Sequence, residues 1–150
     1  FPGESFRVYG YDRDTQDGNL QYRPFSKEGF MTDLASSKGV MATAGFTLMS
    51  EALWLKKPML ALPMAGQFEQ QLNGHCLEQM GLGKNASEPT REAVGDFLYR
   101  LPEYRAALAQ HEARDNTAIL NKLDELLADD CALAREFHAN RKAYAAPEVG

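Results

Sequence analysis

Apolar residues in the first 80 positions alternate between short continuous runs and stretches in which they recur every three or four residues. The runs predict β-strands at residues 5–11, 20–23, 39–43 and 59–63, the second of which is stopped by Pro24. The spaced stretches predict helices, the first capped by Ser26 and the others at residues 46–55 and 67–80. Residues 12–19 form a predicted polar loop. This alternation predicts an α/β fold, specifically a Rossmann-like doubly wound parallel sheet.

Beyond Lys84 the pattern is that of helices alone. Thr90 is a predicted N-cap, Pro102 begins a further helix, and leucines at helical spacing predict another helix near residues 119–127. We therefore expect one domain over residues 1–150, with an α/β part at 1–88 and a helical C-terminal flank at 89–144.

The charge balance limits which ligands the chain can bind. The net charge is −5 and no long basic run occurs, which argues against DNA or RNA as a partner. One nucleotide remains possible, because backbone amides and a helix dipole can hold a diphosphate. No apolar run approaches the length of a membrane span.

The potential metal-binding residues are scattered along the chain. The histidines His75, His111 and His138 lack metal-ligand spacing, and the two cysteines, Cys76 and Cys131, are far apart. We expect reduced thiols in a cytoplasmic protein, with no metal and no cofactor.

The segment from Thr43 to Ala52 carries the most specific chemistry. A small-residue turn at Ala44 and Gly45 leads into an apolar helix, on which Thr47, Ser50, Glu51 and Trp54 share one side. Thr47 lies in the first turn, where its hydroxyl and N–H can meet a phosphate. Glu51 can accept two hydrogen bonds from vicinal hydroxyls such as those of ribose, or it can pair with a lysine or arginine. The spacing alone leaves both possibilities open.

A second polar group begins the helix at residues 67–80. Gln67, Gln70 and Gln71 lie away from a predicted buried stripe formed by Phe68, Leu72, Cys76 and Met80. Amides and carboxylates suit the recognition of sugar hydroxyls. Glu69 in the first turn is alternatively only a partner of the helix dipole.

A third group follows the second predicted strand. In Tyr22-Arg23-Pro24-Phe25 an aromatic side chain can frame a nucleobase or simply border the core, and Arg23 can reach a phosphate or face solvent. The loops Pro24–Phe25, Ala44–Gly45 and Ala65–Gly66 follow successive strands, so all three are expected on one rim of the sheet.

These three segments together resemble the donor-binding half of GT-B glycosyltransferases. The segment from Thr43 to Ala52 is similar to the His-x-Gly…Glu-Ala motif of UDP-sugar transferases, residues 69–73 to their Asp/Glu-Gln-x-x-Asn, and residues 22–25 to their Trp-x-Pro-Gln. Peptidoglycan GlcNAc-transferases have a comparable layout. Lys56 stands where relatives often have glycine at a helix end, which implies a left-handed backbone there.

The resemblance implies a role for each matching residue. Phe25 would meet the base, Gly45, Phe46 and Thr47 the diphosphate, and Glu51 the ribose. Glu69 and Gln70, with Gln67 beside them, would contact the donor sugar. Thr43 replaces a histidine common in relatives, and its hydroxyl would take over a phosphate contact. The chain would thus be the C-terminal half of a GT-B fold.

The resemblance also implies what the chain does not supply. The catalytic base and the acceptor site would belong to an N-terminal domain or a partner chain, so no catalytic residue is assigned. Besides the nucleotide-sugar, the expected partners are an unidentified acceptor and, for the intact protein, a membrane surface. Two alternatives stay open, namely a nucleotide-sugar epimerase of the same fold and a non-catalytic donor-binding subunit of a two-chain transferase.

Overall fold

The computed structural model describes residues 1–111, 120–122, 124 and 125. The chain divides into two compact units, Phe1–Ala113 and Arg114–Gly150. In the second unit the described residues are helical, and Lys122 pairs with Glu125 across 2.7 Å. The leucine stripe predicted near residues 119–127 and the predicted last helix lie largely outside the described residues. No helix within the described part is long and apolar enough to span a bilayer.

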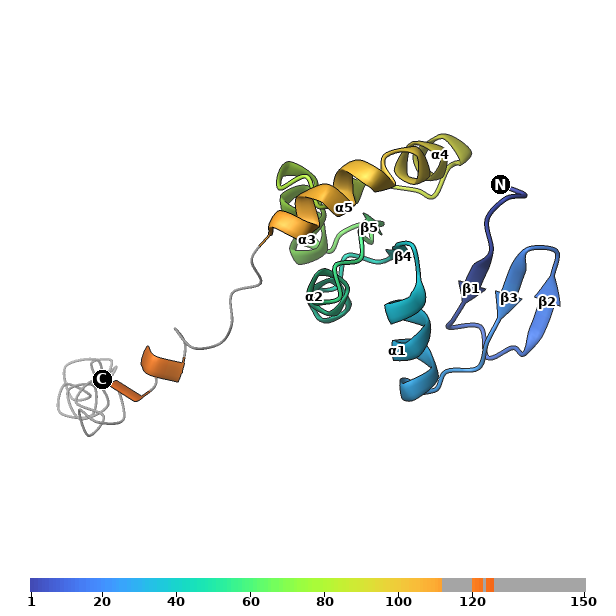
Figure 1. The fold of residues 1–150 in the computed structure, drawn as a ribbon, viewed down its shortest axis with the longest axis horizontal. Helices are drawn as coiled ribbons and strands as arrows, with labels where there is room; N and C mark the ends of the chain where they lie inside the picture. Colours follow the sequence, from blue (N-terminus) through green and yellow to red (C-terminus); the bar gives the residue numbers. More distant parts are fainter. Residues whose placement is uncertain (112–119, 123, 126–150) are drawn as a thin grey trace, which may run out of the picture. The chain divides into compact units, whose positions relative to one another are not determined.

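The first unit contains all the elements that could form the expected sheet (Figure 1). In chain order they are β1 (Phe6–Val8), β2 (Thr15–Asp17), β3 (Leu20–Tyr22), α1 (Lys27–Ser36), β4 (Val40–Ala42), α2 (Phe46–Trp54), β5 (Met59–Ala61), α3 (Phe68–Gln79), β6 (Gly83–Asn85), α4 (Arg91–Tyr99) and α5 (Leu101–Gln110). Ser26 and Thr90 cap α1 and α4 as predicted, accepting from the backbone N–H groups of Gly29 and Ala93.

A parallel sheet in the order β4-β5-β6 forms the centre of this unit. Met59 and Ala61 of β5 pack on one face with Met49 of α2 and Leu77 of α3. Leu60, between them, packs on the opposite face with residues of α4 and α5, including Phe97. Alternation along one fully buried strand therefore places helices on both faces, which confirms the predicted α/β architecture.

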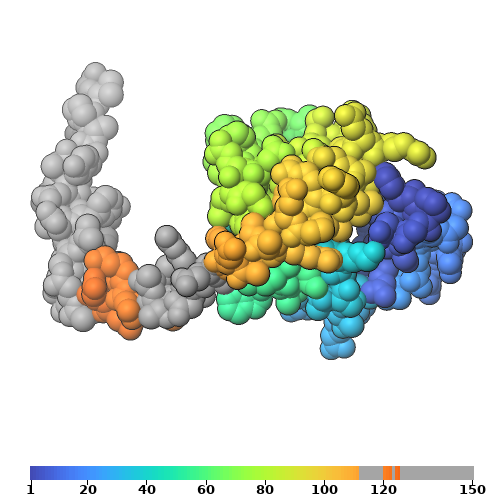
Figure 2. All heavy atoms as spheres, turned by 45° about the horizontal axis from the view of Figure 1, so that its top comes forward, coloured from blue at the N-terminus to red at the C-terminus, as the bar shows by residue number. Residues whose placement is uncertain are grey.

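The helix α5 is attached by hydrogen bonds to the segments that precede β4 and follow α2. Arg105 donates to the carbonyl oxygen of Lys38, just before β4, at 2.9 Å. The Lys56 ammonium donates to the carbonyl oxygen of His111 at the end of α5. In Figure 2 the yellow-orange α5 borders the green and cyan parts of the same unit. Lys56 adopts φ 55°, so the left-handed backbone expected at the end of α2 is confirmed.

A smaller sheet in the order β1-β3-β2 precedes the parallel one. β1 and β3 pair in parallel within this separate sheet, and β2 pairs antiparallel with β3 where the sequence predicted only a loop. All three residues of β2 are exposed, so no apolar alternation marks this strand. Its signal was the two-residue Gly18-Asn19 connection, in which Gly18 has φ 57°, as in a tight hairpin.

The strand β6 was also not predicted, because Gly-Lys-Asn has little strand propensity. The chain is held there by pairing with β5, and Gly83 makes this pairing possible. A Cβ at Gly83 would overlap the backbone carbonyl of Met59. The strand therefore depends on a close backbone approach that only glycine allows.

The helix α3 faces the core with a different side from the one predicted. Phe68 is 77% exposed, and Leu72, Cys76 and Met80 are also exposed, so the predicted buried stripe is wrong. The buried residues are Gly74 and Leu77. A Cβ at Gly74 would overlap the side chain of Asn85 on β6, which means that the small residue sets how closely the helix lies on the sheet.

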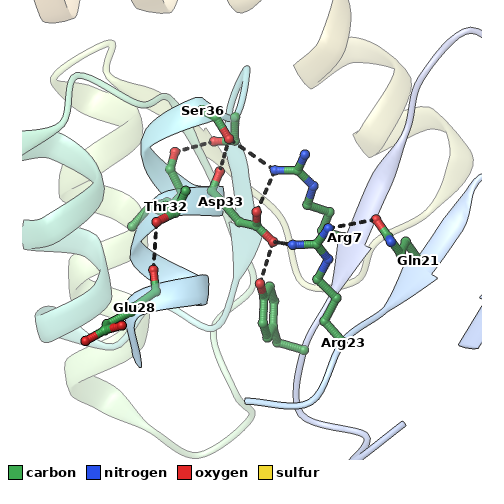
Figure 3. A network of polar contacts seen from close by, with 10 residues as sticks. Arg7, Gln21, Arg23, Glu28, Thr32, Asp33 and Ser36 are labelled. Carbon is green, nitrogen blue, oxygen red and sulfur yellow. Dashed lines mark hydrogen bonds and ion pairs between the residues drawn. The ribbon is translucent and has the colours of Figure 1, made fainter. Parts of the chain in front are cut away.

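Asp33 on α1 joins that helix to the smaller sheet (Figure 3). Its carboxylate accepts from Arg7 at 2.7 Å, from Arg23 at 2.7 Å and from the Tyr9 hydroxyl at 2.5 Å. Arg7 also donates to Ser36, and Arg23 to Gln21. The pKa of Tyr9 is raised, first by burial and then by its hydrogen bond to Asp33, so the hydroxyl stays a donor. Asp33 itself is only 8% exposed.

We predict that Asp33→Asn lowers the free energy of unfolding by about 2–4 kcal/mol, because it removes the charge shared by two arginines at a buried position. Chemical denaturation measures this loss. Glu4→Gln is the matched control, since Glu4 pairs with the exposed Lys38 at 2.9 Å and should cost less than about 1 kcal/mol. Equal effects of the two substitutions would contradict the central role of Asp33.

We further predict that Gly83→Ala destabilises the chain by about 3 kcal/mol, because the added methyl must displace the backbone of β5. Thermal melting followed by circular dichroism tests this. Gly3→Ala serves as the control, because a Cβ there meets no atom within 4 Å and should change stability by less than about 1 kcal/mol. A Gly83→Ala protein that melts like the Gly3→Ala protein would refute the argument.

Candidate functional site

The candidate site lies at the edge of the larger sheet where β4 and β5 end. The two strands are parallel, so the turn after β4 and the loop after β5 emerge at the same edge, which we call the rim. The rim carries Thr43 and Gly45 on the first turn and Gln67 on the second loop. This confirms the predicted proximity of these two loops. The prediction that the loop with Phe25 lies on the same rim is wrong, because that loop follows β3 of the other sheet.

The start of α2 offers unpaired amides at the rim. Gly45 is the N-cap residue and has an extended backbone, with φ −68° and ψ 135°, and no side chain caps the helix. The first-turn N–H groups of Phe46, Thr47 and Leu48 therefore have no intrahelical partner. Phe46 and Thr47 are exposed, so this end of the helix is accessible. An anion placed there would gain hydrogen bonds and the favourable end of the helix dipole.

Glu51 lies one turn further along α2 and is half-buried. Thr47, Ser50 and Trp54 on the same side are exposed, while Met49 and Ala52 face the core, as the helical spacing predicted. Among the described residues, no lysine or arginine pairs with Glu51 and no side-chain hydrogen bond engages its carboxylate. The salt-bridged alternative for Glu51 therefore finds no support in this part of the chain.

The first turns of α3 face the rim with amide side chains. Gln67 is the N-cap residue, and Glu69 in the first turn is exposed. The Gln70 side-chain oxygen accepts from the backbone N–H of Met64 at 3.1 Å, so this residue fixes the loop after β5. Its NH₂ group is the part left for a ligand.

Asn73 is a rim residue that belongs to the Asp/Glu-Gln-x-x-Asn resemblance but received no role in the predicted site. Its side-chain NH₂ donates to the carbonyl oxygen of Ala44 at 3.0 Å, which ties α3 to the turn after β4. The available signals were this motif match and its position three residues after Gln70, which places both side chains on the same face of α3.

The loop after β3 combines an exposed aromatic with an engaged arginine. Phe25 is 71% exposed, and its ring lies 6.0 Å from that of Phe30 on α1. The Arg23 guanidinium forms an ion pair with Asp33 and is therefore not a free group for a phosphate or a solvated side chain. Both alternatives considered for Arg23 are thus replaced by a structural role.

Comparison with known proteins supports the fold and the family. The family described as Glycosyl transferase family 1 matches residues 2–102. Among solved structures, the spinosyn forosaminyltransferase SpnP is similar with a TM-score of 0.66 and 18% identity over 83% of this chain and 35% of that chain. The glycotransferase of kitacinnamycin is similar with a TM-score of 0.58 and 16% identity over 70% of this chain and 29% of that chain. No curated protein is significantly similar in sequence.

The chain spans about a third of the length of these two solved structures, and at such low identity the likeness concerns the fold. The predicted GT-B resemblance is thereby confirmed. Since the family match also covers more than half of the chain and both strand-end loops of the rim, the chain belongs to Glycosyl transferase family 1.

Proposed function

We propose that this chain is the donor-binding part of a glycosyltransferase and that it holds a nucleotide-linked sugar, with UDP as the expected nucleotide. The observation that carries the proposal is the uncapped start of α2 with Glu51 on an accessible side of the same helix. Family membership supports it, because a sugar transferase needs a site for an activated donor.

The proposed orientation of the donor pairs its groups with residues of the rim and of the loop after β3. The diphosphate meets the N–H groups of Gly45, Phe46 and Thr47, with the Thr43 hydroxyl beside them. Glu51 accepts hydrogen bonds from the two ribose hydroxyls, and Phe25, from the loop after β3 of the other sheet, meets the base. Gln67, Glu69 and the NH₂ group of Gln70 at the start of α3 contact the sugar hydroxyls. Each contact pairs a group with the ligand chemistry that suits it.

The proposed reaction is a displacement at the anomeric carbon of the donor. The bond between that carbon and the diphosphate oxygen breaks, a bond to an acceptor oxygen forms, and the acceptor proton passes to a base. The diphosphate leaves with the electron pair, and the α2 amides stabilise its developing charge. The base and the acceptor site are expected outside this chain, so its own contribution is to bind the donor and stabilise the leaving group.

Glu51→Gln tests the proposal directly. We predict that the substitution weakens UDP binding about 10- to 100-fold in isothermal titration, because a neutral amide loses charge-assisted hydrogen bonds to ribose. The melting temperature should stay within about 2 °C of the wild type, because no described residue pairs with Glu51.

Glu92→Gln, which alters an exposed glutamate of α4, is the matched control and should leave both measurements unchanged. A wild-type chain that does not bind UDP at millimolar concentration would refute the proposed function. An unchanged UDP affinity with a lowered melting temperature in Glu51→Gln would instead give Glu51 a structural role.

A further inference from the structure

Asn73 joins two parts of the rim through one hydrogen bond. Its side-chain NH₂ on α3 donates to the carbonyl oxygen of Ala44, which lies in the turn between β4 and α2. Ala44 is fully buried, so its carbonyl group needs a partner within the protein. Asn73 supplies that partner from an element 29 residues later in the chain.

The same hydrogen bond determines the direction of a neighbouring N–H group. The carbonyl of Ala44 and the N–H of Gly45 belong to one planar peptide unit, and in a trans peptide these two groups point in opposite directions. No cis peptide bond occurs among the described residues. Because Asn73 draws the carbonyl toward α3, the Gly45 N–H points away from α3, and no described residue accepts a hydrogen bond from it.

We propose that Asn73 is a positioning residue of the donor site, which fixes the peptide between Ala44 and Gly45 so that the Gly45 N–H faces the donor diphosphate. This inference rests on the proposed function. A hydrogen bond to the carbonyl also polarises the peptide and makes its N–H a stronger donor. Asn73 therefore acts on the ligand through the backbone and not by touching it.

The side chain at this position has to be a neutral donor. A carboxylate would face the Ala44 carbonyl without a proton to offer and would repel a nearby diphosphate. An apolar side chain would leave the buried carbonyl unpaired and the peptide free to rotate. Asparagine meets both requirements with a short side chain that loses little conformational freedom when it is fixed.

The experiment compares UDP with uridine, which lacks the diphosphate. The ratio of the two dissociation constants, that of uridine divided by that of UDP, isolates the diphosphate contribution. We predict that Asn73→Leu lowers this ratio about tenfold, the size of one charge-assisted hydrogen bond, and leaves uridine binding unchanged. Leucine removes the donor without adding a charge.

Two control variants separate this effect from a loss of stability. Asn19→Ala removes the same kind of hydrogen bond at the amino end of β3, where the Asn19 side chain donates to the carbonyls of Phe1 and Glu4 at 2.9 Å, and it should not change the ratio. Glu51→Gln should weaken UDP and uridine by the same factor. A merely structural Asn73 would lower the melting temperature and weaken both ligands equally, which would overturn the inference.

A measurement on the wild-type chain covers the case in which Asn73→Leu does not fold. The Gly45 amide signal in a ¹H–¹⁵N spectrum should move downfield with UDP and stay in place with uridine. A Gly45 signal that stays in place at saturating UDP would overturn the inference while leaving the proposed function intact. If UDP does not bind at all, the proposed function fails instead.

Discussion

The carboxylate of Asp33 is the interaction on which the arrangement of the two sheets most depends. The smaller sheet has strands of three residues each, so its backbone ladder alone provides little cohesion. Its face toward α1 carries Arg7, Tyr9 and Arg23, which meet on Asp33 (Figure 3). Because α1 connects β3 to β4, this polar cluster, together with the edge-to-face contact between the Tyr9 and Phe30 rings, joins the helix to the smaller sheet.

The larger sheet is stabilised by hydrophobic burial and not by a charged cluster. Its strands are apolar and its helices lie on both faces, so the hydrophobic core sets the position of α2 and α3. At the rim the connecting loops are then fixed by amide side chains, with Asn73 on Ala44 and Gln70 on Met64. The proposed donor site thus sits on elements held by burial, and its finer geometry is set by neutral hydrogen bonds.

The sequence predicted those parts of the fold in which local chemistry and burial agree. The caps at Ser26 and Thr90, the buried strand at Met59–Ala61 and the exposed side of α2 around Glu51 were all predicted from local patterns. The strands β2 and β6 were not predicted, because they are held by backbone hydrogen bonds to neighbouring strands. Such pairing leaves no alternation of apolar residues in the sequence. The buried face of α3 was assigned wrongly because Gly74 permits a close approach to β6, and a search for apolar stripes overlooks glycine.

In the site, too, features set by local sequence were predicted and features set by tertiary contacts were not. Thr47 and Glu51 lie on one helix, so their spacing in the sequence places them on one side. The partner of Arg23 comes from the following helix, and Asn73 reaches a carbonyl 29 residues earlier, so only the folded chain brings these groups together. Neutral amides also suit a site for an anion, because they hold the loops without the negative charge of a carboxylate, which would repel the ligand. In a chain of net charge −5, this leaves the backbone dipoles at the start of α2 as a local attraction for a diphosphate.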